Sequence, residues 1–498
     1  MHPRLFIRAD ATVAQGTGHI LRMLALAQAW RRRTGQAPTF LCRALVPALA
    51  ARLSAAGCTM QLLDADPADP AAVAATVAVL SAAVNGPAPV WLVADGYHFG
   101  PAFQAGVRAT GARLALVDDN GENRPYDCDL VVNQNLHAAA ELYAPRATGT
   151  RLLLGSRFVL LREEFLRLRD RERPHPARAT RMLVTLGGAD ADNVTARVIQ
   201  ALRGSDAELR VVVGAANPHA AMLAEQIAPP SLLLRDVQDM TEQMAWADLA
   251  VTAGGSTCWE LCLAGVPFIA IETADNQHAL VGALVAAGAA QDGGCAADLE
   301  GAVLARQVDT LRADLKARRA LSGQARGVVD GYGSDRVVSA LAAPDGLFFR
   351  RARAADAALL WAWANEPAVR AASFCADLIP WESHQRWLAA RLANAEVHIL
   401  IAEHAGEPVG VARFEPSDVG LTISVAVAAA ARGRGWGTQI IAGSTAQVAA
   451  ATGTSRIDAF IKPANLASLR AFERAGYREV EPAVVAGQPA LQRRWERS

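Results

Sequence analysis

The sequence lacks an excess of charge of either sign, a paired cysteine framework and a long hydrophobic run. Lys plus Arg and Asp plus Glu both number 49, so the formal net charge is zero. This balance argues against a nucleic-acid-binding surface and against a polybasic membrane anchor. The seven cysteines are odd in number and form no Cys-x-x-Cys pair, which indicates a reduced protein rather than a disulfide scaffold.

Membrane-spanning and targeting segments are also missing. The apolar segment Ala71–Val84 is shorter than the roughly 20 residues that a membrane span needs, and the chain enters a strand without the apolar core of a signal peptide. We therefore expect a soluble, cytoplasmic protein with no membrane or nucleic-acid partner. Cys258 and Cys262 are one helical turn apart, which favours core packing over metal binding, and no metal site is predicted.

What the sequence does contain is three blocks, residues 1–165, 180–342 and 347–498, in keeping with about three domains for 498 residues. In the first two blocks, short apolar runs alternate with helical segments, a pattern typical of parallel strands buried on both faces. We predict two doubly wound, Rossmann-like α/β domains, whose ligands bind beyond the carboxyl ends of the strands. The expected strands are Leu5–Arg8, Thr39–Cys42, Met60–Leu63, Val90–Ala94, Leu114–Val117 and Leu130–Val132, then Met182–Leu186, Leu209–Val213, Leu232–Leu234, Leu249–Thr252 and Phe268–Ile271.

Two short segments separate the blocks. Leu166–Thr180 is charged and contains proline, so we interpret it as a connection whose arginines face solvent. Ala342–Gly346 precedes a different pattern, in which Trp-rich helices are followed by several strands, a basic glycine loop and a long helix. This third block is predicted to be a separate α+β domain of ordinary size.

The first candidate site is Gly16-Thr17-Gly18-His19, between an apolar strand and a helix. Glycines allow a tight turn and a close approach to a ligand, and a helix start favours anions. Because a helix start disfavours the imidazolium ion, we expect His19 to be neutral near pH 7 and able to accept a proton. Leu21 stands where a dinucleotide loop has its third glycine, which argues against a nicotinamide or flavin site. A plain helix residue is the alternative for His19.

The second block carries two candidate phosphate loops. Gly187-Gly188-Ala189-Asp190 follows one strand, and Gly254-Gly255-Ser256-Thr257 follows another and opens a helix that bears Glu260. Paired glycines expose backbone N–H groups, and Ser256 and Thr257 can cap the helix or bind a phosphate. The Glu260 carboxylate can accept both hydroxyls of a ribose. Tight turns with ordinary capping are the alternative, but two such loops favour a nucleotide diphosphate.

Further polar groups follow the expected strands, where each is either a ligand contact or a turn residue. They are Asp95-Gly96-Tyr97-His98, Asp118-Asp119-Asn120, Asn133-Gln134-Asn135 and Asp275-Asn276-Gln277.

The motifs of the first two blocks occur in the same order as those of a known family. They are Ile7-Arg8-Ala9-Asp10, Gly16-x-Gly18-His19-x-x-Arg22, Val117-Asp118-Asp119, Asp127-Cys128-Asp129-Leu130, Asn133-Gln134-Asn135, Leu154-Gly155-x-x-Phe158, Gly187-Gly188-Ala189-Asp190, Ala253-Gly254-Gly255-Ser256-Thr257-x-Trp259-Glu260, Gly265-x-Pro267 and Asn276-Gln277. Over about residues 4–340 the chain resembles the UDP-2,4-diacetamido-2,4,6-trideoxy-β-L-altropyranose hydrolases of pseudaminic acid biosynthesis.

The resemblance implies a two-Rossmann fold of the type B glycosyltransferase kind and hydrolysis at the anomeric carbon, with inversion and release of UDP. It makes His19 the base that activates water, and Gly18, Arg22, Tyr97 and Asn276 contacts of the sugar. UDP is a good leaving group, so donors on its phosphates can replace the acid that most glycosidases use. The alternative is a type B glycosyltransferase that uses the same donor, because fold does not decide the reaction.

The third block carries Arg432-Gly433-Arg434-Gly435-Trp436-Gly437-Thr438 before the expected helix Gln439–Ala451. Backbone N–H groups at such a helix start can bind a pyrophosphate. With Asn465, Ser468 and Gly476-Tyr477 downstream, residues 347–495 resemble the GNAT acetyltransferases. This resemblance implies acetyl-CoA as the cosubstrate, bound between two splayed strands by the glycine loop, with Asn465 and Ser468 near the CoA arm.

Phe472 stands where many GNAT members have the tyrosine that protonates the thiolate. Ser468, Tyr477 or water are the substitutes considered. Asn365-Glu366-Pro367 and His384-x-x-Trp387 are similar to a subgroup that acetylates amino sugars. We expect the small-molecule partners to be a UDP-sugar and acetyl-CoA, with acetylation of a 4-amino group before hydrolysis. An unrelated amine substrate, or CoA binding without turnover, is the alternative.

Overall fold

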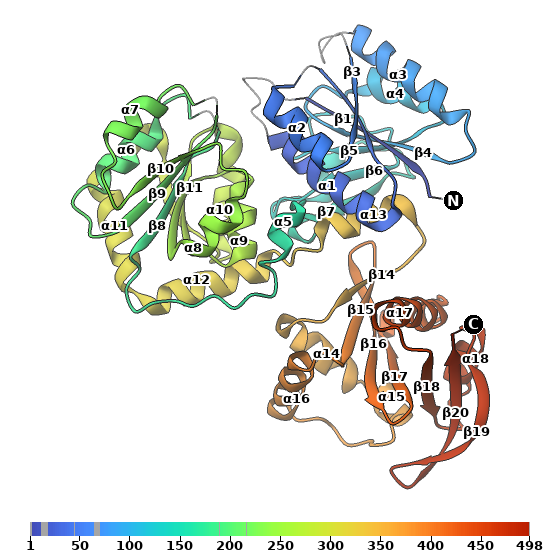
Figure 1. The fold of residues 1–498 in the computed structure, drawn as a ribbon. Coiled ribbons are helices and arrows are strands. Elements are labelled where there is room, and N and C mark those ends of the chain that lie inside the picture. Colours follow the sequence, from blue (N-terminus) through green and yellow to red (C-terminus); the bar gives the residue numbers. More distant parts are fainter. Residues whose placement is uncertain are drawn as a thin grey trace. The chain divides into compact units, whose positions relative to one another are not determined.

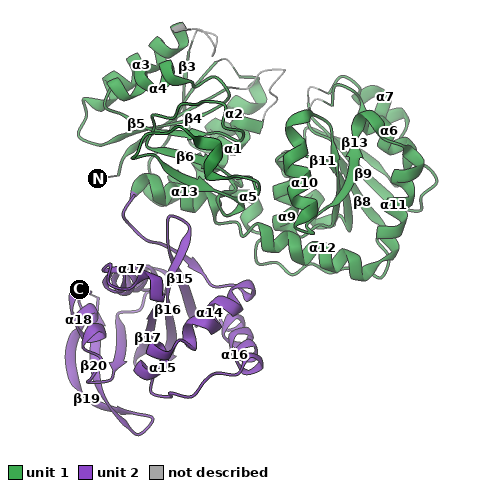
Figure 2. Ribbon diagram, turned by 180° about the vertical axis from the view of Figure 1, so that it is seen from behind, with its two compact units in different colours: residues 1–342 green, residues 343–498 purple. Residues whose placement is uncertain are grey.

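The computed structural model describes residues 2–10, 18–43, 45–63, 70–188, 190–215 and 217–497. The chain divides into two compact units, residues 1–342 and residues 343–498 (Figure 2). The first unit contains two parallel sheets and the second contains one mixed sheet (Figure 1). Within the described ranges, no helix is long and apolar enough to cross a membrane.

The first sheet has seven parallel strands in the order β3-β2-β1-β4-β5-β6-β7. Its elements are β1 (Arg4–Ala9), α1 (Gly18–Thr34), β2 (Thr39–Cys42), α2 (Pro47–Ala55), β3 (Thr59–Leu62), α3 (Pro70–Val84), β4 (Val90–Asp95), α4 (Pro101–Ala109), β5 (Arg113–Val117), β6 (Leu130–Asn133) and β7 (Arg151–Leu154).

The strand β1 shows why these sequences are almost continuously apolar. All its residues after Arg4 are buried. Leu5 and Ile7 pack with α1 and α2, whereas Phe6 packs on the opposite face with α3 and α4. A strand covered on both faces needs an apolar residue at every position.

The second sheet has six parallel strands in the order β10-β9-β8-β11-β12-β13. Its elements are β8 (Arg181–Thr185), α6 (Val194–Ala201), β9 (Glu208–Val213), α7 (Ala220–Glu225), β10 (Leu232–Arg235), α8 (Met240–Trp246), β11 (Leu249–Ala253), α9 (Thr257–Ala264), β12 (Phe268–Glu272), η3 (Asp275–Gln277), α10 (His278–Ala286), β13 (Gln291–Cys295), η4 (Ala296–Asp298), α11 (Gly301–Ala313) and α12 (Leu315–Val328). Cys258 and Cys262 are buried in the core beside α8 and α10, as expected.

The helix α13 (Gly333–Ala342) corrects the predicted boundary of the second block at residue 342. It packs against α1, and Val337, Val338 and Leu341 belong to the core of the first sheet. An apolar helical face fits either sheet equally well, so the sequence pattern does not reveal this return of the chain.

The connection after α5 (Glu163–Leu166) is also more ordered than a solvated linker. Arg173 donates hydrogen bonds to the backbone oxygens of Met244, Ala247 and Ala264, at the ends of α8 and α9. Burial, together with Arg326, lowers the pKa of Arg173 to about 10. The arginine therefore satisfies carbonyl groups that helix ends leave free.

The second unit has the strand order β14-β15-β16-β17-β18-β20-β19, in which only the β17–β18 pair is parallel. Helices α14 and α16 cover one face and α17 and α18 the other. Its elements are β14 (Phe348–Arg351), α14 (Ala357–Ala364), α15 (Pro367–Ala372), α16 (Trp381–Ala393), β15 (His398–His404), β16 (Glu407–Ser417), β17 (Gly420–Val427), α17 (Trp436–Thr452), β18 (Arg456–Ile461), α18 (Leu466–Arg474), β19 (Arg478–Val485) and β20 (Gln488–Glu496). The three sheets confirm the predicted fold class.

Candidate active site

The carboxyl edge of the first sheet brings together polar side chains from three elements. His19 and Arg22 lie in the first turns of α1, Asp95 ends β4, and Asp119 follows β5. His19, Asp95 and Arg22 are largely buried. Gly18 is the first residue of α1, while Gly16 and Thr17 lie outside the described residues.

His19 and Arg22 share one carboxylate. Nδ1 of His19 lies 2.6 Å from Oδ1 of Asp95. The Arg22 guanidinium donates to both Asp95 oxygens, from Nε to Oδ2 at 2.5 Å and from Nη2 to Oδ1 at 2.6 Å. Its Nη1 donates to Oδ2 of Asp119 at 2.6 Å. Arg22, predicted to contact the sugar, thus donates three of its five N–H groups to protein carboxylates.

The charges in this network stabilise one another. Burial alone would raise the pKa of Asp95, but Arg22 and His19 outweigh it and lower that pKa to about 2. Burial likewise opposes the charge on Arg22, yet Asp119 and Asp95 together raise its pKa. Asp95 is therefore an anion at neutral pH.

Tyr97 stands over the edge of the His19 ring. The two ring centroids are 5.2 Å apart at an interplanar angle of 86°, and the Tyr97 side chain is partly exposed. Desolvation, followed by the nearby Asp119 carboxylate, raises the pKa of the Tyr97 hydroxyl. Tyr97 thus lies directly beside His19, and its contact with a sugar stays a prediction.

The remaining polar groups at this edge build the loops. Asp118 accepts hydrogen bonds from the backbone N–H groups of Gly121 and Asn123 and from the Tyr126 hydroxyl, so it is a turn residue. Asn135 donates to Oδ1 of Asp119 at 2.9 Å. Asp119 is thus fixed between two donors.

The two glycine loops at the carboxyl edge of the second sheet present mainly backbone. Gly187 has a φ of +95°, which an L side chain rarely adopts. Ala189 lies outside the described residues, and Asp190 caps α6 by accepting from the N–H groups of Val194 and Thr195. Capping is therefore the observed role of Asp190, while Gly187 and Gly188 have open space beside them.

The second glycine loop is held by Gln277. Its Oε1 accepts from the N–H groups of Gly254 at 3.1 Å and Thr273 at 2.9 Å. A Cβ at Gly254 would lie 2.4 Å from Cγ2 of Val281, whereas one at Gly255 would meet nothing. Ser256 precedes α9 without capping it, and Thr257 is the first residue of that helix. Two N–H groups of the first turn are used within it, since Cys258 donates to the Gly255 carbonyl and Trp259 to the Ser256 carbonyl.

Glu260 is paired before any ligand arrives. Its Oε1 accepts from Nη2 of Arg162 at 3.1 Å, and Arg162 also contacts Glu164. Burial raises the pKa of Glu260 although Arg162 opposes the shift. The structure therefore leaves Oε2 as the oxygen that a ribose hydroxyl could reach.

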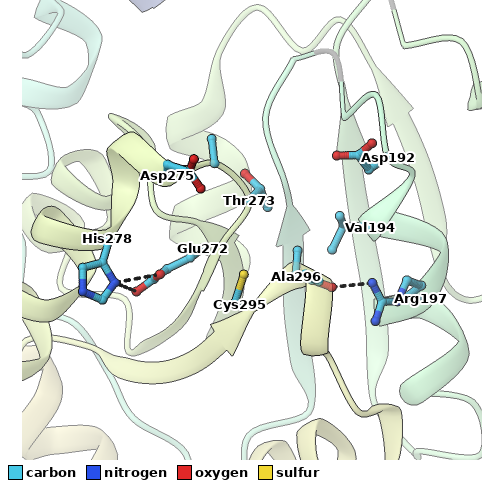
Figure 3. A pocket seen from close by; sticks show the side chains of 11 residues that line it. Asp192, Val194, Arg197, Glu272, Thr273, Asp275, His278, Cys295 and Ala296 are labelled. Atoms are coloured by element: carbon cyan, nitrogen blue, oxygen red, sulfur yellow. Dashed lines mark hydrogen bonds and ion pairs between the residues drawn. The ribbon is translucent and has the colours of Figure 1, made fainter.

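Asn276 lies in η3, after the strand β12 of the second sheet, and its side chain is exposed. It is not part of the hydrogen-bond network at the first sheet. Next to η3 is a pocket of about 670 Å³, bounded by the start of α6, the end of β12 and η4 (Figure 3). Glu272, Asp275, His278, Cys295 and Arg197 line it. None of the predicted UDP-binding residues lines this pocket.

The third site lies where β17 and β18 separate. These strands pair only at Leu421–Ile457 and Thr422–Asp458, and then diverge. Gly433 and Gly435 have φ values of +75° and +80°, and α17 starts at Trp436 without a side-chain cap. Gly437 and Thr438 continue the first turn of α17, so backbone N–H groups point out of the helix start beside the opening.

The two arginines beside this opening differ in whether a protein side chain already pairs with them. Arg432 forms a bidentate pair with Glu366, at 2.5 and 2.7 Å, whereas Arg434 is exposed. Asn465 caps α18 by accepting from the Ser468 N–H at 3.2 Å. The Arg432–Glu366 pair joins the glycine loop to the α14–α15 turn.

Tyr477 is unsuited to replace the missing tyrosine. Its hydroxyl is buried and lies 2.7 Å from Oγ1 of Thr445, and its ring packs edge-on against Phe472. Of the substitutes considered, Ser468 and water remain.

The sequence analysis missed the contacts that Asp95, Asp119 and Glu366 make. Position at the end of a strand was the only available signal for Asp95, and its partner His19 is 76 residues away. Among the described residues no group of three or more His, Cys, Asp or Glu side chains is arranged to hold a metal ion.

Comparisons with known proteins match two parts of the chain. Residues 183–324 match the glycosyltransferase family 28 C-terminal domain, and residues 347–478 match the acetyltransferase (GNAT) domain. The spore coat polysaccharide biosynthesis protein SpsG of Bacillus subtilis is 26% identical over 239 residues, which cover 47% of this chain and 70% of that protein.

Two solved structures are similar at lower identity. MurG of Acinetobacter baumannii is 16% identical, with a TM-score of 0.47, over 68% of this chain and 99% of its own. AAC(6')-Ib in complex with paromomycin and acetyl-CoA is 22% identical, with a TM-score of 0.28, over 31% of this chain and 94% of its own. The chain therefore contains a domain similar to the glycosyltransferase family 28 C-terminal domain, followed by a GNAT acetyltransferase domain.

Proposed function

We propose that the first unit hydrolyses a UDP-linked 2,4-diacetamido-2,4,6-trideoxy sugar, as in pseudaminic acid biosynthesis. Water attacks the anomeric carbon, the bond to the UDP oxygen breaks, UDP leaves as an anion, and the sugar configuration inverts. His19 takes the proton from water as the general base. The observation that carries this proposal is the buried His19, whose Nδ1 is occupied by Asp95 while Nε2 has no hydrogen-bond partner among the described residues.

The glycine loops of the second sheet are proposed to hold UDP. Gly187 and Gly188 would supply N–H groups for the diphosphate, with Ser256 and Thr257 at the start of α9. Gly254 and Gly255, whose N–H groups donate to the Ile271 and Ala253 carbonyls, would let the diphosphate approach the backbone closely. Glu260 would accept a ribose hydroxyl, and Gly18, Arg22, Tyr97 and Asn276 would position the sugar. Donors on the leaving phosphate lessen the need for a protonating acid.

The second unit is proposed to acetylate the 4-amino group of the precursor UDP-sugar with acetyl-CoA. The amine attacks the thioester carbonyl, the carbon–sulfur bond breaks and CoA leaves as a thiolate. The proton that the amine nitrogen loses reaches the thiolate by way of Ser468 or water. The diverging strands β17 and β18 and the open N–H groups after Gly435 support this proposal. Arg432 and Arg434 would face the pyrophosphate, with Gly433, Trp436, Gly437 and Thr438 in the same loop, and with Asn465 and Ser468 near the CoA arm.

One experiment tests both steps. Purified protein is given the 4-amino UDP-sugar with and without acetyl-CoA, or the diacetamido UDP-sugar alone, and products are followed by mass spectrometry. The proposal predicts acetyl-CoA-dependent release of CoA in the first case and release of UDP without an added acceptor in the second. Absence of CoA release would refute the acetylation step.

The match to glycosyltransferase family 28 favours a second candidate, transfer of the sugar to an acceptor. A transferase would release almost no UDP until its acceptor is added. UDP release in buffer alone therefore separates the two reactions.

A further inference from the structure

The contact between Asp95 and His19 has a chemical consequence for the imidazole. A neutral imidazole carries its proton on one ring nitrogen only, and an ionised carboxylate is an acceptor only. With Oδ1 of Asp95 at 2.6 Å, Nδ1 must be the protonated nitrogen. The lone pair is then on Nε2, which has no hydrogen-bond partner in the described part of the chain.

Arg22 keeps this carboxylate charged and in place. It donates to both oxygens of Asp95 and holds Asp119 with its third nitrogen. The Nη2 of Arg22 also lies 3.3 Å from Nδ1 of His19. Since a guanidinium cannot accept a hydrogen bond, it cannot take the Nδ1 proton, and Asp95 is the acceptor available to it.

We propose that Asp95 is a positioning residue that holds His19 in the tautomer whose Nε2 can accept a proton from water. This inference rests on the proposed hydrolysis for its catalytic meaning, but the tautomer itself is a property of the free protein. Asp95 does not take the proton; it orients the ring and stabilises the imidazolium that forms when Nε2 is protonated. The same division of roles operates in Ser-His-Asp hydrolases.

The groups around His19 define a matched comparison. Asp95, Arg22 and Tyr97 contact the ring, whereas Asp119 is held by Arg22 and Asn135. A purely structural role, namely neutralising Arg22, would make Asp95 and Asp119 equivalent. A positioning role makes only Asp95 matter for the tautomer, because an amide nitrogen at Asp95 would donate to Nδ1 and favour the proton on Nε2.

The test measures the ring nitrogens of His19 by ¹⁵N NMR in the full-length wild type, D95N and D119N, with the signal assigned from H19A. We expect a protonated Nδ1 in the wild type and D119N, and a protonated Nε2 in D95N. In parallel, D95N is expected to lower kcat by about 10³–10⁴-fold with KM changed by less than about threefold, because the ground-state contacts remain. D119N is expected to lose less than about tenfold, since it keeps the His19 partner.

Several results would overturn the inference. They are a wild-type ring protonated at Nε2, a D95N variant with the wild-type tautomer and kcat, or equal losses in D95N and D119N. The wild-type spectrum needs no substitution, so the inference stays falsifiable if D95N does not fold. Failure of wild type to release UDP would instead refute the proposed hydrolysis, while the spectrum would still decide the role of Asp95 at the ring.

Discussion

The carboxyl edges of the two parallel sheets differ in the chemical groups that they present. At the first edge, His19, Arg22, Asp95 and Asp119 form a closed network of side chains with distances of 2.5–2.6 Å. At the second edge, glycines allow a ligand to approach the backbone closely, and the half-buried Glu260 carboxylate is tied to Arg162. Proton transfer needs a fixed titratable group, whereas a diphosphate needs many neutral donors at close range. The two edges therefore suit the two different tasks that we propose for them.

The largest expected effect separates the first edge from the second unit. H19A removes the proposed base, so UDP release is expected to fall by about 10²–10⁴-fold, while acetyl transfer keeps its wild-type rate. Both activities are measured on the same preparation, by UDP and CoA release. Loss of both activities would point to misfolding instead of to a missing base, and an unchanged UDP release would contradict the role of His19.

Gly254 tests whether the second edge depends on its backbone. G254A places a Cβ 2.4 Å from Val281, and such overpacking costs about 1–3 kcal/mol of unfolding free energy. G255A is the matched control because its Cβ meets nothing. Urea unfolding and UDP titration calorimetry should show that G254A loses both stability and affinity and that G255A loses affinity alone. Unaltered UDP affinity in both variants would show that this loop does not bind the nucleotide.

The two edges should also respond differently to acid. The pKa of Asp95 is lowered from 3.8 to about 2, so its stabilising contribution is complete above the unfolded pKa and is lost as the pH falls from about 4 towards 2. Linkage puts this contribution at about 2 kcal/mol. Glu260 has a raised pKa because of burial and gives no such gain.

Unfolding free energies measured between pH 5 and pH 2 check this difference. D95N should lack part of the wild-type slope below pH 4, and E260Q should keep it. A slope that is the same in all three proteins would show that Arg22 and His19 do not stabilise the Asp95 anion.

The smallest expected effect lies in the second unit. Y477F removes a buried hydroxyl that pairs with Thr445, which should cost about 1 kcal/mol of stability. Because this hydroxyl is directed into the core, the rate of acetyl transfer should change by less than about twofold. A loss of two orders of magnitude in kcat would instead identify Tyr477 as the acid that protonates CoA.

Local sequence patterns were sufficient for the buried strands and for the glycine loops. They failed for elements and contacts that depend on the tertiary fold and not on the local sequence. The exposed strand β13 has the sequence Gln291-Asp292-Gly293-Gly294-Cys295 without an apolar pattern. The helix α13 has an apolar face, but this face does not indicate which of the two sheets it packs against. The Asp95–His19 and Arg432–Glu366 pairs join residues 76 and 66 positions apart, and one sequence alone contains no spacing rule for such partners.

Isotope labelling of the attacking oxygen tests the central claim most directly. The wild type is incubated with the diacetamido UDP-sugar in H₂¹⁸O without an acceptor, and the sugar and UDP are analysed by mass spectrometry and by ¹H NMR at the first turnover. The account predicts ¹⁸O on the anomeric carbon of an inverted sugar and unlabelled UDP. Label in the UDP phosphate, or no UDP released until an acceptor is added, would contradict it.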